Sequence, residues 1–84
     1  MKLLIRNLAR TTTESELRGL FSQHGAVQYC NLVMDDQSGE SKGFAFVEMP
    51  KAGEAKIAMQ TLNGMNLSGN KIRVKKAESK KETD

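Results

Sequence analysis

Hydrophobic and polar residues alternate with a period of two in four short stretches of the chain. These stretches cover residues 2–8, 27–34, 42–49 and 71–77. A period of two is typical of β-strands, because successive side chains of a strand point to opposite faces. The pattern therefore predicts four strands, the third closed by Pro50.

Residues 11–25 follow a helical pattern instead. Their apolar stripe consists of Leu17, Leu20 and Phe21. Thr13 can cap this helix, and Glu16 three residues later completes a capping box. Gly25 is placed where a helix is expected to stop.

Residues 51–64 predict a second helix, which ends at Gly64. Its apolar positions follow the spacing i, i+3, i+4 and i+7, and they are Ala55, Ala58, Met59 and Leu62. The resulting element order is β-α-β-β-α-β, which is the split βαβ or ferredoxin-like pattern. We therefore predict an α+β fold with a four-stranded antiparallel sheet and two helices on one face.

Three of the predicted strands have one uncharged side and one side that carries charges. The uncharged sides hold Leu3, Ile5, Ala45, Val47, Met49, Ile72 and Val74. The opposite sides hold Lys2, Leu4, Arg6, Lys42, Phe44, Phe46, Glu48, Lys71, Arg73 and Lys75. Because two helices cover only one face of such a sheet, we expect the uncharged sides to form the core.

This assignment leaves Phe44 and Phe46 on the open face among basic side chains. Exposed aromatic rings are costly unless something covers them. Unpaired bases stack on flat rings while cations bind phosphates, so the arrangement suits single-stranded nucleic acid. Charge placement agrees, since residues 1–41 have a balance of −1 and residues 42–84 a balance of +4.

The stretch KGFAFVEM at residues 42–49 resembles the octamer of the RNA-recognition motif family. The stretch LLIRNL at residues 3–8 resembles the companion hexamer on the first strand. The resemblance covers about residues 2–77 and extends to small single-domain bacterial RNA-binding proteins. It implies an RNA-recognition motif domain at residues 1–77, followed by a charged tail at 78–84 that we expect to be disordered.

The resemblance also implies roles for individual residues. Phe44 and Phe46 would stack on bases or pack against a sugar, and Lys42 would meet a phosphate. Asn7, where the first strand ends, would shape the loop or touch RNA. Residues 76–78, Lys76 to Glu78, would offer backbone contacts to bases after the last strand. The predicted RNA-binding set is Leu4, Arg6, Asn7, Tyr29, Asn31, Lys42, Phe44, Phe46, Glu48, Arg73, Lys75 and Lys76.

The sequence departs from the family pattern at two positions. Leu4 stands where the hexamer usually has Tyr or Phe, so one flat stacking surface is absent. Asn70 stands where the family often has arginine. Tyr29 shares its parity with Asn31 and can reach the open face from the second strand, which would compensate in part for Leu4.

Cysteine and histidine counts bear on the alternatives. With one cysteine, Cys30, and one histidine, His24, the 84-residue chain offers neither an internal disulfide nor a cysteine-based metal cluster. We therefore predict no cofactor and no catalysis. The carboxylates Asp35, Asp36 and Glu40 lack the spacing of a calcium loop, and we interpret them as part of a solvated turn.

Several choices stay open at this point. The partner can be single-stranded RNA or single-stranded DNA, and a protein-interaction module on the same fold is the alternative function. We expect a monomer that does not span a membrane, since no apolar run approaches the ~20 residues required. We expect a cytoplasmic protein if the source is bacterial, and a nuclear or cytoplasmic one if it is eukaryotic. The chain can be a stand-alone module or a fragment of a longer protein.

Overall fold

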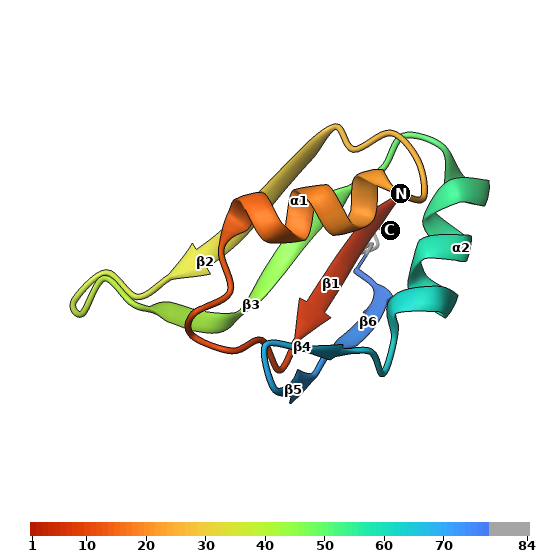
Figure 1. Ribbon diagram of the computed structural model, residues 1–84. Helices are drawn as coiled ribbons and strands as arrows, with labels where there is room; N and C mark the ends of the chain where they lie inside the picture. The colour runs from red at the N-terminus through yellow and green to blue at the C-terminus, as the bar shows by residue number, and fades with distance from the viewer. Residues whose placement is uncertain (78–84) are drawn as a thin grey trace.

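The computed structural model describes residues 1–77, and their elements follow the predicted order (Figure 1). The elements are β1 (Lys2–Arg6), α1 (Glu14–Ser22), β2 (Tyr29–Met34), β3 (Ser41–Glu48), α2 (Ala52–Leu62), β4 (Asn66–Leu67), β5 (Asn70–Lys71) and β6 (Arg73–Lys76). The main sheet has the antiparallel order β2-β3-β1-β6, and both helices cover the same face of it. The predicted fold class is confirmed.

The core lies between the sheet and the two helices, on the uncharged side of the strands. All seven core residues predicted from the strand parity are less than 5% exposed. The helices add Leu17, Phe21, Ala55, Ala58 and Leu62 to the same cluster. Burial of apolar surface contributes about 25 cal/mol per Å², so this single layer supplies most of the driving force for folding.

Helix α1 begins as its sequence predicts. The Thr13 hydroxyl accepts the Glu16 backbone N–H at 3.2 Å, and the Glu16 carboxylate accepts the Thr13 N–H at 2.9 Å. Glu14 in the first turn accepts the backbone N–H of Leu32 at 3.1 Å. This contact ties α1 to β2, an outer strand of the sheet, and occupies a donor that another chain could otherwise pair with.

Both helices are shorter than the sequence pattern predicts. The segment predicted as a helix over residues 11–25 is helical only over Glu14–Ser22, because Thr13 caps it and residues 23–25 leave the helix. The segment predicted over residues 51–64 is helical over Ala52–Leu62. No helix within residues 1–77 is long and apolar enough to cross a membrane.

The last strand was predicted over residues 71–77, and the predicted start at residue 71 is wrong. Lys71 belongs to a two-stranded hairpin of β4 and β5 rather than to the main sheet. Ile72 separates this hairpin from β6, with its N–H donated to Met65 and its carbonyl accepting the N–H of Gly64. Strands of two residues are too short to show a period in the sequence, so the pattern could not distinguish them from β6.

Two further boundary corrections have local causes. The first strand ends at Arg6 rather than residue 8, because Asn7 takes a positive φ of 60°. The second strand begins at Tyr29 rather than residue 27. Gln28 donates its N–H to the carbonyl of Glu48, but the regular pairing with β3 starts only at Tyr29. The predicted tail at 78–84 lies outside the described residues.

Cys30 gives a test of the packing between α1 and β2. Burial, and to a lesser degree the negative charge of Glu14, raises the pKa of the Cys30 thiol from 9.0 to about 11. We expect alkylation at pH 8 to be roughly 100-fold slower in the folded than in the unfolded protein, because the thiolate is the reactive form. Stability should fall as pH rises from 9 toward 11, since the unfolded thiol ionises first. Equal alkylation rates in buffer and in denaturant would contradict this packing.

Candidate nucleic-acid interface

The strand register aligns four predicted residues in one row across the open face. Asn31 of β2 is paired with Phe46 of β3, Phe46 with Leu4 of β1, and Leu4 with Lys75 of β6. Directly opposed side chains of neighbouring strands have Cβ atoms about 4.5–5.5 Å apart. We call Asn31, Phe46, Leu4 and Lys75 the central row.

The two phenylalanines form a pair at the middle of this face. Their ring centroids are 6.1 Å apart and the planes meet at 88°, an edge-to-face arrangement. Both rings are half-buried, so each keeps an accessible surface. The Lys2 ammonium lies 4.9 Å from the centroid of the Phe46 ring, within the range of a cation–π contact. Lys2 shares the predicted parity but was missing from the predicted set.

Two predicted residues lie on one side of the central row. Tyr29 is paired with Glu48, and Glu48 with Lys2. Tyr29 is 38% exposed, which makes its ring accessible from solvent. The Glu48 carboxylate accepts a hydrogen bond at 2.8 Å from the ammonium of Met1, whose second bond goes to the Met49 carbonyl. This pairing offsets the negative charge of Glu48.

On the other side of the central row, two arginines stand opposite one another. Arg6 of β1 is paired with Arg73 of β6, and both are exposed. Like charges in directly opposed positions destabilise a sheet. A hollow of about 440 Å³ lies against them and is also lined by Asn7 and Lys75. The sheet therefore keeps a local excess of positive charge that an anion would relieve.

Asn7 connects the end of β1 to the small hairpin. Its Nδ2 donates to the carbonyl of Lys71 at 2.8 Å, and its own carbonyl accepts the Nδ2 of Asn70 at 3.2 Å. Asparagine tolerates the left-handed conformation found here better than most residues do. Asn7 thus fixes the loop after β1 against the hairpin, and Asn70 takes part in that contact.

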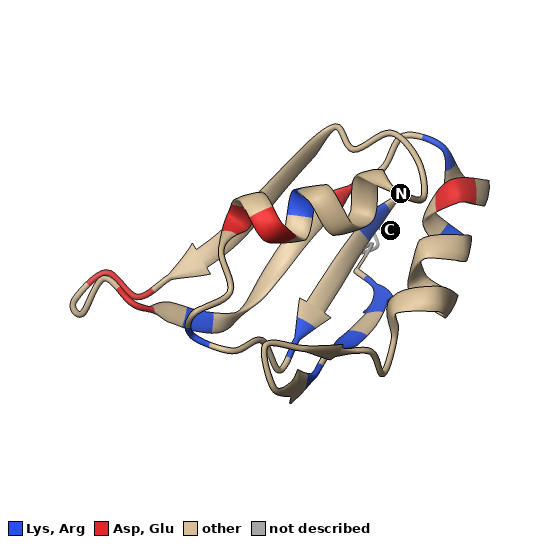
Figure 2. Ribbon diagram, viewed as in Figure 1, with Lys and Arg blue, Asp and Glu red and all other residues tan. Residues whose placement is uncertain are grey.

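Lys42 and Gly43 lie where β3 begins, beside the loop after β1. Gly43 has a φ of 85°, which favours glycine, and its carbonyl accepts the Leu8 N–H at 2.9 Å. A hollow of about 280 Å³ here is lined by Arg6, Arg10, Lys42 and Phe44 among others. Figure 2 shows basic residues at this end of the sheet and acidic residues on the adjoining loop between β2 and β3.

Arg10 was missing from the predicted set. It lies in the loop after β1, and its Nη1 contacts the Glu40 Oε1 at 2.6 Å. Both side chains are largely exposed, 74% and 59%. The two residues are thirty positions apart and show no periodic signal, so sequence reasoning had no means of pairing them.

Lys76 departs from the other predicted cations. It is paired with Leu3, whose side chain is in the core, so the Lys76 side chain leaves the sheet on the helix-covered side. The role predicted for Lys76 was a backbone contact to a base, and the direction of its side chain does not affect that role. The remaining members of the predicted set share the open face or its border at Asn7 and Lys42.

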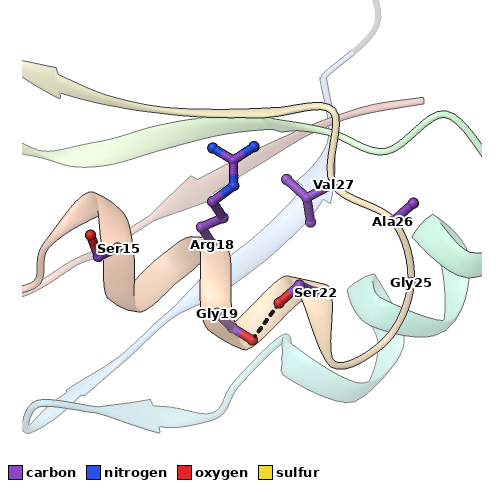
Figure 3. Close-up of a pocket in the computed structure, with 7 residues that line it drawn as sticks. All are labelled: Ser15, Arg18, Gly19, Ser22, Gly25, Ala26 and Val27. Carbon is purple, nitrogen blue, oxygen red and sulfur yellow. Dashed lines mark hydrogen bonds between the residues drawn. The ribbon is translucent and has the colours of Figure 1, made fainter.

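A larger hollow of about 580 Å³ lies beside α1 and the loop that follows it (Figure 3). The charged side chain among its lining residues is Arg18. Ser22 is already engaged, since its hydroxyl donates to the Gly19 carbonyl at 3.0 Å. This hollow is formed by the helix layer and contains none of the predicted residues.

Residues 3–73 match the family model described as the RNA recognition motif. The chain belongs to the RNA recognition motif family. It is 45% identical over 67 residues to the human Transformer-2 protein homolog alpha, covering 80% of this chain and 24% of that protein. It is 37% identical over 79 residues to chloroplastic RNA-binding protein CP31B of Arabidopsis thaliana, covering 94% and 27%. The chain thus spans about a quarter of these curated relatives.

A solved structure agrees with this membership over nearly the whole fold. The crystal structure of RNA Binding Protein PG1 has a TM-score of 0.90 at 35% identity, covering 95% of this chain and 96% of that one. The high TM-score shows that this RNA recognition motif has the fold of its family.

Asn7 provides a test of the loop geometry. Asn7→Ala should lower the free energy of unfolding by about 1–3 kcal/mol, because it removes a hydrogen bond and strains a left-handed residue. Asn7→Gly removes the same bond but tolerates the positive φ, so it should cost about 1 kcal/mol less. Urea denaturation of both variants measures the difference. Equal losses would mean that the backbone at this position is unstrained.

Proposed function

We propose that this domain binds single-stranded RNA on the open face of its sheet. The observation that carries the proposal is the Phe44–Phe46 pair, accessible at the centre of the face, with Arg6 opposite Arg73 beside it. Each ring offers a surface on which a base can stack, and each arginine can meet a phosphate. A neighbour that supports this proposal is a solved Sex-lethal protein/RNA complex, with a TM-score of 0.89 at 28% identity, covering 96% of this chain and 48% of that chain.

The layout of charges suggests how a strand would lie. Lys75 stands at one end of the central row, with Arg6 and Arg73 in the next row. Phosphates that follow this basic border would place their bases over the rings, since a nucleotide's base and phosphate extend in different directions. Leu4, between Phe46 and Lys75, supplies apolar contact but no π-face. We therefore propose two stacked bases rather than three.

We propose that the domain does no chemistry. Within residues 1–77, no group of three or more His, Cys, Asp or Glu side chains could hold a metal ion. The one thiol in this region, Cys30, is buried with a raised pKa, which disfavours the nucleophilic thiolate. The domain would then act by holding RNA, which keeps other molecules off the bound nucleotides or recruits them.

A second candidate is a protein partner on the same face, and Leu4 is the observation that favours it. An aliphatic side chain beside Phe46 can take a partner's apolar side chain as readily as a base. Single-stranded DNA is a further ligand that stacking alone would accept, because only contacts to the 2′-hydroxyl distinguish RNA. We propose that the domain acts as a monomer.

The ring pair gives the first test of RNA binding. Phe44→Ala and Phe46→Ala should each weaken binding to an eight-nucleotide mixed-sequence RNA by about 1–3 kcal/mol, because each removes a stacking surface. Fluorescence anisotropy measures the affinity, and thermal unfolding should change little because both rings are on the open face.

Ile57→Ala is the matched control, since Ile57 is a 56% exposed apolar residue on α2. It should leave RNA affinity unchanged. If the Phe44→Ala/Phe46→Ala protein is folded and binds RNA as tightly as wild type, stacking on this face is excluded.

Leu4 provides the complementary test. Leu4→Phe places a third ring in the central row beside Phe46 and should tighten RNA binding by about 1 kcal/mol through stacking. Leu4→Met is the control, because it preserves apolar volume without a flat ring and should leave affinity near wild type. Weaker binding by Leu4→Phe would mean that leucine is fitted to a particular contact.

A further inference from the structure

The hollow where β3 begins has the composition of an anion site. Arg6, Arg10 and Lys42 bring three positive charges to its lining, and Phe44 forms part of the same wall. A phosphate attached to a nucleotide stacked on Phe44 would lie within reach of these cations. Arginine presents several N–H donors in a planar fork that suits phosphate oxygens.

One of these cations already has an anionic partner from the β2–β3 loop. Arg10 contacts Glu40 at 2.6 Å, and Arg10 also borders a second, more apolar hollow lined by Leu32 and Met34. Because both side chains of the ion pair are largely exposed, solvent screens the pair and its net stabilisation is small. Such a contact can be exchanged for a stronger one at little cost.

The loop that carries Glu40 has a defined shape. The Asp35 carboxylate accepts the backbone N–H groups of Gln37 and Ser38 at 2.8 and 3.0 Å, which closes the turn. These two bonds hold the pKa of Asp35 below its ordinary value, and Lys42 lowers it further. The turn therefore presents a fixed negative charge toward Lys42, while Glu40 extends to Arg10.

We propose that Arg10, beside Arg6 and Lys42, contacts a phosphate of the nucleotide stacked on Phe44, and that Glu40 occupies Arg10 until RNA displaces it. This inference rests on the proposed function, since the phosphate belongs to the bound strand. Glu40 acts as a competing anion that lowers affinity for RNA. It leaves the sheet face itself unchanged.

Glu40→Gln tests the competition, because it removes the negative charge with almost no change in shape. In fluorescence anisotropy with the eight-nucleotide RNA, this variant should bind about three- to fivefold more tightly at low salt. The slope of log K against log salt should be steeper for this variant than for wild type, because salt weakens the Arg10–Glu40 ion pair that RNA must break in wild type. No gain in affinity would overturn the proposal.

Two comparisons separate the ion pair from the general charge of the loop. Asp36→Asn makes the same charge change on the same loop, and within residues 1–77 Asp36 has no hydrogen bond or ion pair. It should therefore produce a smaller gain. In an Arg10→Gln background, Glu40→Gln should have no effect. Two results would overturn the proposal: an equal gain in RNA affinity from Asp36→Asn, or an undiminished gain from Glu40→Gln in the Arg10→Gln background. Either result would mean that Glu40 acts only by long-range repulsion of RNA.

A separate readout distinguishes this inference from the proposed function. If wild type and Glu40→Gln both fail to bind RNA, the proposed function fails. Binding of inorganic phosphate at Arg10 then tests the phosphate site by itself. In NMR spectra of the Arg10 Nε–Hε group, phosphate should shift the signal in Glu40→Gln and much less in wild type. An unresponsive Arg10 in both proteins would overturn the phosphate site as well.

Discussion

The structure depends on the burial of only one face of a four-stranded sheet. Two short helices supply enough apolar surface for one face, and the strand parity places Leu3, Ile5, Val47 and Val74 beneath them. Since side chains alternate along every strand, this burial forces the neighbouring residues onto the opposite face. The positions of Phe44 and Phe46 are thus a direct consequence of how the core is built.

The open face carries a local energetic cost that is consistent with ligand binding. Arg6 and Arg73 repel one another across β1 and β6, and the two rings keep part of their surface in water. Lys2 above Phe46 covers one ring in part and so reduces this cost. A strand of RNA would cover the rings and neutralise the arginines at the same time.

Loops at the ends of the strands border this face. Asn7 holds the loop after β1 against the small hairpin, and Gly43 allows β3 to begin close to Leu8. The β2–β3 loop adds the Arg10–Glu40 pair at the same end. Loops of this kind allow members of one family to differ in affinity, because they can change while the sheet and core stay the same.

The sequence by itself determined the fold class, the core and the orientation of the rings, because each follows from short-range periodicity. The alternation in residues 42–49 assigns Phe44 and Phe46 to one face, and the burial of Ala45 and Val47 confirms that assignment. RNA contact at the predicted residues stays a prediction that the proposed variants test.

Only the tertiary structure decided which residues face one another across strands. The register places Arg6 opposite Arg73 and aligns Leu4 with Phe46, and neither pairing follows from the parity of a single strand. The β4–β5 hairpin and the contact between Arg10 and Glu40 also required coordinates. Periodicity indicates which side of a strand a residue occupies. These contacts depend instead on how segments far apart in the sequence pack together, and no local pattern in the chain encodes that packing.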